Sequence, residues 1–335
     1  MEAQKLEAMP PPPGVISSLK AGFDVVSTHI VAILLPVALD LLLWLGPRLS
    51  LEKLVGPAVA DMIQLIRVSP VPGQDAQVII EFYKRVGEQF SRYNLFDVLR
   101  TFPIGIFSLM VDKLPAENPF GPQSVMQVSS IFSWFGWLVL LTLLGWVGGG
   151  LYFRWVSGAA LGGEEAGISP LRAVTQTILL SVLWIIAALI IFVPVSLVFT
   201  LLYLISPLLV QGGLLLLGIF SVWLIVPLFF TPHGIFVRKQ NAFTSIYFSL
   251  RMARFTLPTS SLFILGVFLL SQGLNYLWKV PPADSWMMLV GIIGHAFITT
   301  ALLAASFVYY RDMNVWLQIM LEKLQQQAKS PTGRI

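Results

Sequence analysis

Four polar residues stand inside long apolar stretches, where an ionisable or amide side chain is costly unless it has a partner. They are Asp40, Gln272, Asn275 and His295. At the 1.5 Å rise of a helix, Asp40, Gln272 and His295 fall roughly 10–13 Å below the outer ends of their apolar stretches. Asn275 and Gln211 are somewhat shallower. We therefore expect helices one, four, five and six of a bundle to place polar groups at one level, in the outer half of a membrane.

This polar layer is compatible with two kinds of chemistry. If Asp40 and His295 face each other across a shallow, outward-facing cavity, they can pair or relay a proton. Alternatively, the same groups hydrogen-bond across helices and hold the bundle together. The small residues Gly291 and Gly294 beside the imidazole allow close helix packing and favour the second interpretation.

Patterns that mark catalysis or metal binding are missing from the sequence. The chain has no cysteine, which excludes disulfides, a thiolate nucleophile and cysteine-based zinc or iron–sulfur sites. It also has no His-Glu-x-x-His, no Gly-x-Ser-x-Gly and no nucleotide-binding fingerprint. Gly148–Gly150 is followed by no Lys-Ser or Lys-Thr and is read as the end of a span. We expect no enzyme, no cofactor and no metal site.

The composition is that of a membrane protein. Of 335 residues, 56% are hydrophobic and only 11% are charged, whereas soluble domains carry roughly 25% charged residues. The net charge of +4 follows from basic residues at helix ends, so it does not indicate a nucleic-acid partner. The predicted fold class is all-α, a polytopic membrane bundle of about six transmembrane helices.

Six apolar segments are long enough to cross a hydrocarbon core of ~30 Å. The predicted spans are residues 27–45, 131–153, 173–205, 207–230, 257–278 and 286–308, within a membrane domain over 21–310. Ile205-Ser206-Pro207 predicts a very tight turn between the third and fourth spans.

A long insertion over residues 47–130 separates the first two spans and is expected outside the cytosol. Amphipathic helices are predicted over 51–68 and 75–93, the second with one apolar face. This face comprises Val78, Ile79, Phe82, Val86 and Phe90. Asn94 is a candidate helix cap, with Asp97 at the capping-box position. Residues 95–110 carry Asp97, Arg100 and Pro103, and we expect this segment to lie in the membrane interface.

Charge bias sets the expected orientation. With six spans and a cytosolic N-terminus, the inner segments collect twelve lysines and arginines, while the short outer turns collect only Lys279. Both termini are therefore predicted to be cytosolic, with residues 1–20 disordered and residues 311–335 forming an amphipathic tail. The corresponding location is a bacterial inner (plasma) membrane.

The stretch from Pro232 to Phe243, continuing through Ser245, Ser249 and Arg251, combines a span end, a polar break and an amphipathic re-entry. Over about 30 residues it resembles a loose group of bacterial six-span membrane proteins. The group includes the membrane domain attached to some glycerophosphoryl diester phosphodiesterases and the YciC-type uncharacterised inner-membrane proteins. The resemblance implies an all-helical integral membrane protein; the phosphodiesterase catalytic domain is absent, so its chemistry does not carry over.

The chain departs from this group at two places. Ser245 stands where the group usually has alanine, and Arg238-Lys239-Gln240 replaces the usual acidic residue in the break. Ser249 and Arg251 match the serine and basic positions of the pattern.

Two functions are compatible with these features. The first is a non-enzymatic membrane helper or scaffold that binds membrane lipids or another membrane protein, through the amphipathic tail and insertion. The alternative is a small-solute or lipid transporter that uses Asp40, Gln272 and His295. Pairing of the carboxylate with the imidazole across a wet cavity would favour the transporter, and dry, bonded positions would favour the helper.

Overall fold

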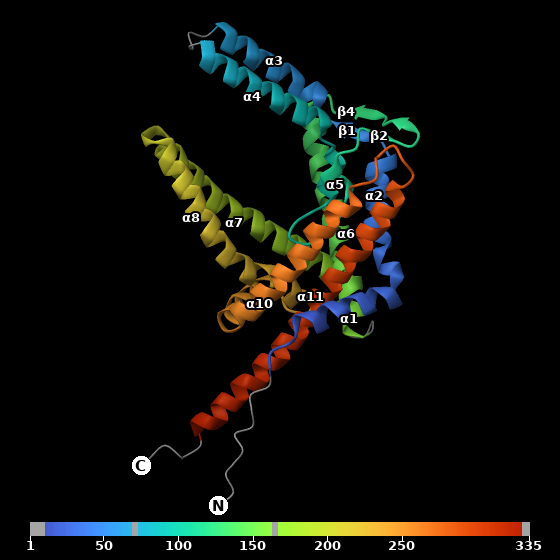
Figure 1. Ribbon diagram of the computed structural model, residues 1–335, viewed down its shortest axis with the longest axis vertical. Helices are drawn as coiled ribbons and strands as arrows, with labels where there is room; N and C mark the ends of the chain where they lie inside the picture. The colour runs from blue at the N-terminus through green and yellow to red at the C-terminus, as the bar shows by residue number, and fades with distance from the viewer. Residues whose placement is uncertain (1–10, 69–72, 163–166, 330–335) are drawn as a thin grey trace, which may run out of the picture. The chain divides into compact units, whose positions relative to one another are not determined.

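The computed structural model describes residues 11–68, 73–162 and 167–329. The chain is predominantly helical, with a few very short strands (Figure 1). Its contacts divide it into two compact units. Unit 1 comprises Met1–His29, Phe153–Ser271 and Thr300–Ile335, and unit 2 comprises Ile30–Tyr152 and Gln272–Thr299. Long helices α6, α10 and α11 run through both units.

The elements follow one another from the N-terminus with short connections. In chain order they are α1 (Val15–Thr28), η1 (Ile30–Ile33), α2 (Leu34–Leu45), β1 (Arg48–Ser50), α3 (Glu52–Val68), α4 (Gly73–Arg92), η2 (Leu95–Leu99), α5 (Met110–Lys113), β2 (Glu117–Asn118), β3 (Gly121–Pro122), β4 (Val125–Gln127), α6 (Ile131–Leu161), α7 (Pro170–Ile205), α8 (Pro207–Phe229), α9 (Thr231–Arg238), α10 (Ala242–Trp278) and α11 (Met288–Lys329).

Four of these helices, α6, α7, α10 and α11, are long and apolar enough to cross a membrane. Two further helix pairs meet the same standard only when each bent pair counts as a single crossing. They are Val15–Thr28 with Ile30–Leu45, and Pro207–Ser221 with Leu224–Arg238. By length and composition the described residues therefore hold four to six candidate spans. This agrees with the predicted all-α, polytopic class.

The predicted tight turn between the third and fourth spans is present. Helix α7 ends at Ile205, Ser206 is the single linking residue, and α8 begins at Pro207. The Ser206 hydroxyl accepts a hydrogen bond of 3.2 Å from the N–H of Leu208, and proline suits the first helical position because that N–H has no intrahelical partner.

The first predicted span, residues 27–45, is not one continuous helix. It breaks at His29, which has φ −125° and ψ 57°. The hydroxyls of Ser27 and Thr28 both donate to the Asp24 carbonyl, at 2.8 and 2.9 Å. Such side-chain bonds satisfy carbonyls at a helix end and compete with continuation of the helix. Pro36 then falls in the first turn of α2, where its missing N–H costs nothing.

Other helices extend beyond the predicted limits. Helix α6 continues to Leu161, so Gly148–Gly150 lies inside it and does not end the span. Helix α11 continues without a break through the predicted separate tail to Lys329. Helix α1 begins at Val15, so the expected disorder over 1–20 is wrong for its last six residues, while residues 1–10 and 330–335 lie outside the described chain.

The core of unit 1 is aromatic. Phe263 from α10 stacks on Tyr309 from α11, with ring centroids 4.0 Å apart and an interplanar angle of 7°. Phe230, at the junction of α8 and α9, stacks on the same tyrosine at 6.0 Å. The other buried members of this cluster are Met252, Ala305, Tyr310 and Met313. The end of α8 is thereby packed against both long helices.

The core of unit 2 gathers residues from the insertion onto α6. Leu49, Leu51, Leu95 and Val128 pack with Leu141 of the helix. Strand β1 pairs in parallel with β4, with Arg48 opposite Val125, and β2 pairs antiparallel with β3. The insertion is therefore a folded structure with its own apolar core.

Helices α3 and α4 lie side by side as a hairpin (Figure 1). Gly87 allows close approach, since an added Cβ would stand 3.3 Å from Val59 Cγ1. Both helices agree with the predicted amphipathic segments. On the predicted apolar face of α4, however, Val78, Phe82 and Phe90 are 71%, 61% and 41% exposed. Much of that face is uncovered.

The segment over residues 95–110 begins with a short helical turn and is otherwise irregular. Asn94 does cap a helix, accepting from the N–H of Phe96 at 3.2 Å, but this helix is the short 3₁₀ turn η2. Beyond it the chain is irregular, because Pro103 and Gly105 disfavour helix. Ile104, also in this segment, is fully buried in unit 2.

Candidate functional site

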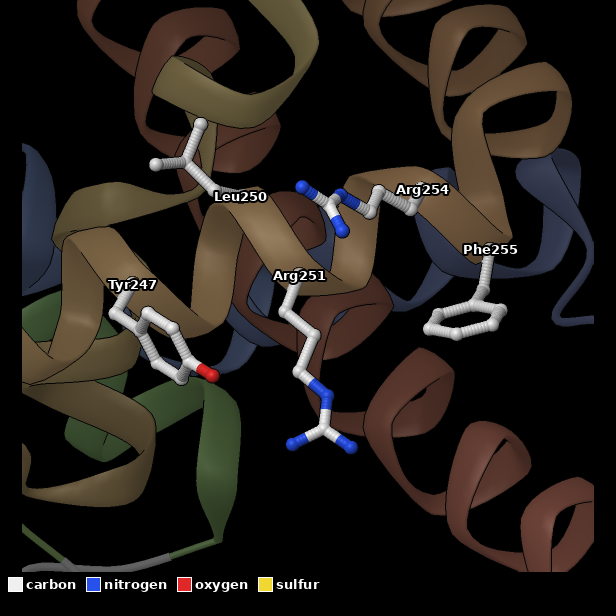
Figure 2. A pocket seen from close by; sticks show the side chains of 5 residues that line it. All are labelled: Tyr247, Leu250, Arg251, Arg254 and Phe255. Atoms are coloured by element: carbon white, nitrogen blue, oxygen red, sulfur yellow. The ribbon is translucent and has the colours of Figure 1, made fainter.

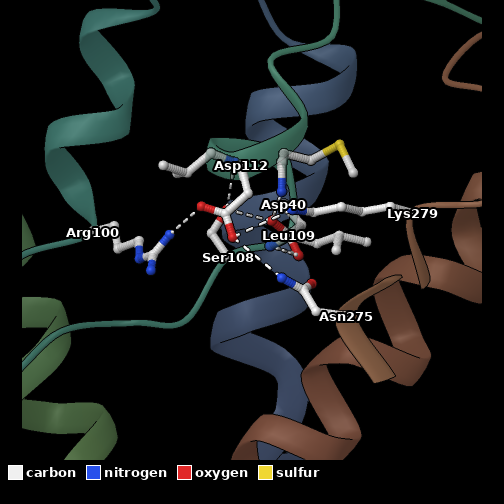
Figure 3. Close-up of polar contacts among 9 residues, drawn as sticks. Asp40, Arg100, Ser108, Leu109, Asp112, Asn275 and Lys279 are labelled. Atoms are coloured by element: carbon white, nitrogen blue, oxygen red, sulfur yellow. Dashed lines mark hydrogen bonds and ion pairs between the residues drawn. The ribbon is translucent and has the colours of Figure 1, made fainter. Parts of the chain in front are cut away.

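A polar network in unit 2 surrounds Asp40, one of the predicted site residues (Figure 3). Helix α2 places this carboxylate against the segment that leads into α5, and the residue is fully buried. Its oxygens accept from the Ser108 hydroxyl at 2.5 Å and from the N–H groups of Leu109 and Met110 at 3.1 and 3.0 Å. Three donors therefore converge on one carboxylate.

The donors are available because α5 begins here. The first N–H groups of any helix lack an intrahelical acceptor, and a side-chain oxygen usually supplies one. Ser108 caps the N–H of Val111 at 3.2 Å, while Asp40, 68 residues away along the chain, accepts from Leu109 and Met110. The carboxylate thus ties the insertion to α2.

The C-terminal end of α2 is held by the same insertion. Its last carbonyls have no intrahelical donor, and Gln123 Nε2 donates to those of Leu43 and Trp44 at 2.9 and 2.7 Å. Asn118 Nδ2 also donates to the Trp44 carbonyl, at 3.3 Å. The Trp44 indole donates in turn to the Ala283 carbonyl at 2.6 Å. The Asp40 side chain and the last carbonyls of α2 are therefore all hydrogen-bonded to protein groups.

Asp112 forms an ionic layer beside this carboxylate. It pairs with Arg100 at 2.9 Å and with Lys279 at 3.7 Å, and it accepts from Asn275 Nδ2 at 3.3 Å (Figure 3). Partial burial raises the pKa of Asp112, but the two cations and the amide outweigh burial and leave the pKa below its usual value. This carboxyl is accordingly an anion at neutral pH.

Lys113 extends the network to the loop after α10. Its ammonium donates to the carbonyls of Lys279 and Pro281 at 2.7 and 2.5 Å. Burial and the neighbouring charge of Lys279 lower the pKa of Lys113. The contacts are to neutral carbonyls, so this lysine fastens two loops together and leaves Asp112 to balance the other cations.

Asp97 is the second buried carboxylate of the insertion. Its backbone N–H donates to the Asn94 carbonyl at 2.8 Å, but its side-chain Oδ2 has no hydrogen-bond partner among the described residues. Burial raises the pKa of Asp97 to about 7, against the opposing charge of Arg100. The group therefore changes charge near neutral pH, unlike its neighbour Asp112.

Close packing of the insertion on α6 sets the position of these groups. An added Cβ on Gly145 would stand 2.7 Å from the carbonyl oxygen of Leu99. One on Gly149 would stand 2.8 Å from both the Cα of Gly105 and the carbonyl oxygen of Ile104. These two glycines, one helical turn apart, let the backbone of the insertion lie directly on the helix.

The predicted polar layer is only partly assembled. Asp40 bonds to Ser108 and its neighbours, and Asn275 joins the Asp112 layer. His295 is buried, but its Nε2 has no hydrogen-bond partner in the described chain, and no bond joins it to Asp40. Gln272 is exposed on α10. Asp40 is therefore not paired with His295, as one interpretation of the sequence required, and is bound by the insertion.

The glycines beside the imidazole have the packing role that their size suggests. An added Cβ on Gly291 would stand 2.4 Å from the Trp278 carbonyl oxygen, and one on Gly294 would stand 2.6 Å from the Trp278 ring. Helix α11 therefore approaches the end of α10 as closely as backbone allows.

The serines of the inner-loop pattern lie in unit 1, where they satisfy backbone carbonyls at the break between α8 and α9. Ser249 donates to the Pro227 carbonyl, and Ser245 donates to the Thr231 carbonyl at 2.5 Å. Both serines are fully buried. A Cβ on Gly234 would stand 2.1 Å from Ser245 Oγ, so glycine is what permits this contact.

Sequence reasoning missed several partners of the site. Arg100 and Ser108 belong to the segment over 95–110 that was expected to lie in the membrane interface, and Asp112 follows that segment in α5. One signal was present: Gly145 and Gly149 mark a small-residue face on α6, which indicates a backbone packed against the helix.

No protein-family model, no curated protein and no solved structure matches this chain. The resemblance of residues 232–255 to the six-span group therefore stays a prediction. Among the described residues, no group of three or more histidine, aspartate or glutamate side chains could hold a metal ion.

Proposed function

We propose that the chain is a six-span protein of a bacterial inner membrane, with both termini in the cytosol and the insertion of residues 47–130 outside. The four long apolar helices and two broken pairs support six crossings. The orientation is supported by the basic residues outside the insertion, of which twelve fall in inner segments and one in the short outer turns. The insertion carries eight more, but long loops cross a membrane largely regardless of charge. Membership of the loose six-span group is part of this proposal, supported by the buried Ser245 and Ser249, which bond to carbonyls at the junction of α8 and α9.

The proposed role is that of a non-enzymatic helper or scaffold. The observation that carries it is the saturation of Asp40, whose oxygens accept three hydrogen bonds from Ser108, Leu109 and Met110. A carboxylate held in this way fixes the insertion and is unavailable to a solute or a travelling proton. This weakens the transporter alternative, which relies on an exchangeable pair between Asp40 and His295.

The binding element of the scaffold is the α3–α4 hairpin. Large apolar side chains remain exposed along both helices: Met62, Leu65, Val68, Val78, Phe82 and Phe90. Exposed apolar surface of this kind is typical of protein or membrane contacts. The occupants that fit are membrane lipids at the outer surface or another membrane protein.

The topology can be tested by single-cysteine labelling, because the chain contains no native cysteine. We expect Gln77→Cys in α4 to react with an impermeant maleimide in intact spheroplasts. Gln240→Cys, after α9, should react only after the membrane is permeabilised. The opposite pattern, or extraction of the chain by alkaline carbonate, would contradict the proposed topology.

The scaffold role can be tested by native mass spectrometry of the chain in native lipid particles. We expect the native chain to carry a second protein in a stoichiometric amount, or retained lipid. The double variant Val78→Asn/Phe82→Asn should lose this bound partner or lipid. The control Gln77→Ala/Glu88→Ala changes exposed polar positions of the same helix and should retain the partner. A native chain that carries neither, with solute uptake that depends on His295, would support the transporter instead.

A further inference from the structure

Unit 1 contains a long stretch of sequence with basic residues and no acidic ones. From residue 167 to residue 271 the sequence has five lysines and arginines and no aspartate or glutamate. Two of them have other partners. Arg172 donates to the Lys239 carbonyl at 2.5 Å, and Arg238 lies over the Phe248 ring at 5.2 Å and donates to Asn314.

Arg251 and Arg254 differ from those two. Both are exposed, and among the described residues neither forms an ion pair. They line a groove of about 290 Å³ on α10 together with Tyr247, Leu250 and Phe255. By volume this groove has room for roughly ten water molecules, which is enough for a phosphate and its nearest substituents.

The shape of the groove combines charge with aromatic walls (Figure 2). Arg251 projects from the helix between the rings of Tyr247 and Phe255, and the tyrosine hydroxyl is directed toward the arginine side of the groove. Arg254 extends along the helix toward Leu250. Guanidinium groups bind phosphate oxygens in a fork geometry, and a phenol adds a further donor.

The position along α10 points to a lipid as the source of the phosphate. The groove occupies residues 247–255, ahead of the predicted apolar span over 257–278. Tyrosine and arginine at such a position lie at the level of lipid headgroups, where basic pockets bind anionic lipids. Tyr247 and Phe255 are 61% and 54% exposed, and their apolar parts can meet the upper part of an acyl chain.

We propose that this groove, defined by Tyr247, Leu250, Arg251, Arg254 and Phe255, binds the phosphate of an anionic phospholipid of the cytosolic leaflet. The proposal rests on the proposed membrane topology and deepens it by assigning a lipid class and a site. The aromatic rings hold the glycerol and upper acyl region, and the two arginines neutralise the phosphate and retain the lipid.

The test is native mass spectrometry of the purified chain titrated with palmitoyl-oleoyl phosphatidylglycerol or with palmitoyl-oleoyl phosphatidylcholine. We expect preferential binding of phosphatidylglycerol. At about 1 kcal/mol per surface cation, Arg251→Gln or Arg254→Gln should weaken it about fivefold, and the double variant about thirtyfold. Arg251→Lys/Arg254→Lys should bind with intermediate affinity, because charge is kept and the fork is lost.

Lys239→Gln is the matched control, since it removes one positive charge of unit 1 outside the groove, and it should bind phosphatidylglycerol like the native chain. Equal binding by the Arg251→Gln/Arg254→Gln variant would overturn the proposal, as would complete displacement of the lipid by inorganic phosphate. Equal thermal unfolding of the native chain and the variants establishes that folding is unchanged. If the chain failed to integrate into lipid nanodiscs, the membrane topology itself would be wrong; integration with unchanged lipid affinity would reject the site alone.

Discussion

Asp40 in unit 2 and Arg251 in unit 1 are both charged side chains in a largely apolar chain, yet their surroundings are opposite. Asp40 is fully buried and accepts three hydrogen bonds from the insertion. Arg251 is exposed, lines a groove with a second arginine and forms no ion pair among the described residues.

The difference indicates two uses of charge. A buried carboxylate with every oxygen bonded positions the chain that supplies the donors, since breaking those bonds strands groups away from water. An exposed guanidinium without a protein partner keeps its binding capacity for a ligand. We therefore assign Asp40 to structure and Arg251 to recognition, and the following changes test that assignment.

The largest effect is expected from Asp40→Ala. The substitution leaves the Ser108 hydroxyl and the N–H groups of Leu109 and Met110 buried without an acceptor. We expect a loss of about 3–5 kcal/mol in the stability of unit 2, measured as a lower thermal unfolding midpoint in native lipid particles. Gln272→Ala, at an exposed position, should leave the midpoint unchanged; an equal loss at both positions would argue against a specific anchor.

Stability should also depend on pH through Asp97. Because burial raises the pKa of Asp97 to about 7, the folded chain holds a proton between about pH 4 and pH 7 that the unfolded chain has released. The contribution of Asp97 to stability is then greatest below pH 4, and it falls by about 2–4 kcal/mol as the pH rises to 7.

Asp97→Asn should remove this decrease and raise the unfolding midpoint at pH 8.

Asp112→Asn is the contrasting variant. The pKa of Asp112 is lowered in the folded chain, so its contribution is present above the unfolded value and is lost in acid. That variant should lower the midpoint at neutral pH. A midpoint of the Asp97 variant that still falls between pH 4 and 7 would refute the role of this group.

Close packing of the insertion on α6 predicts an intermediate effect. Gly149→Ala places a Cβ 2.8 Å from the Cα of Gly105 and the carbonyl of Ile104, so backbone must move at a cost of about 1–3 kcal/mol. Gly136→Ala in the same helix meets nothing within 4 Å and should stabilise the helix by up to about 1 kcal/mol. Thermal unfolding of the two variants should shift in opposite directions.

The smallest effect is expected at the α8–α9 break. Ser249→Ala removes the donor to the Pro227 carbonyl and should cost about 1–2 kcal/mol. Thermal unfolding should detect this loss, while phosphatidylglycerol binding at Arg251 and Arg254 should not change. A loss of lipid binding without a loss of stability would show that the serine contributes to the groove.

The long helices could be predicted from sequence because their signal is local. An apolar run such as 173–205 identifies α7 by itself, and Pro207 after Ser206 marks the start of α8. The break at His29 was not predicted, because the Ser27 and Thr28 hydroxyls that satisfy the Asp24 carbonyl stand inside an otherwise continuous apolar pattern.

The site was predicted only in part because its contacts are distant in sequence. Asp40 and Asn275 could be identified as costly polar groups in apolar stretches. Their partners could not, since Ser108 lies 68 residues from Asp40 and Asp112 lies 163 residues from Asn275. The apolar content of residues 95–110 suggested a membrane surface, but it did not show that the backbone of Leu99, Ile104 and Gly105 packs on the glycines of α6.

The most direct test of the anchoring role is hydrogen exchange, followed by mass spectrometry, in native lipid particles. We predict that Asp40→Asn accelerates exchange of the N–H groups at Leu109 and Met110, because an amide cannot replace both carboxylate oxygens as acceptors. His295→Ala should leave the exchange of the same groups unchanged. Unchanged protection of these N–H groups in Asp40→Asn would contradict the anchoring role. An equal loss of protection in His295→Ala would also contradict it, and would indicate that Asp40 and His295 act together.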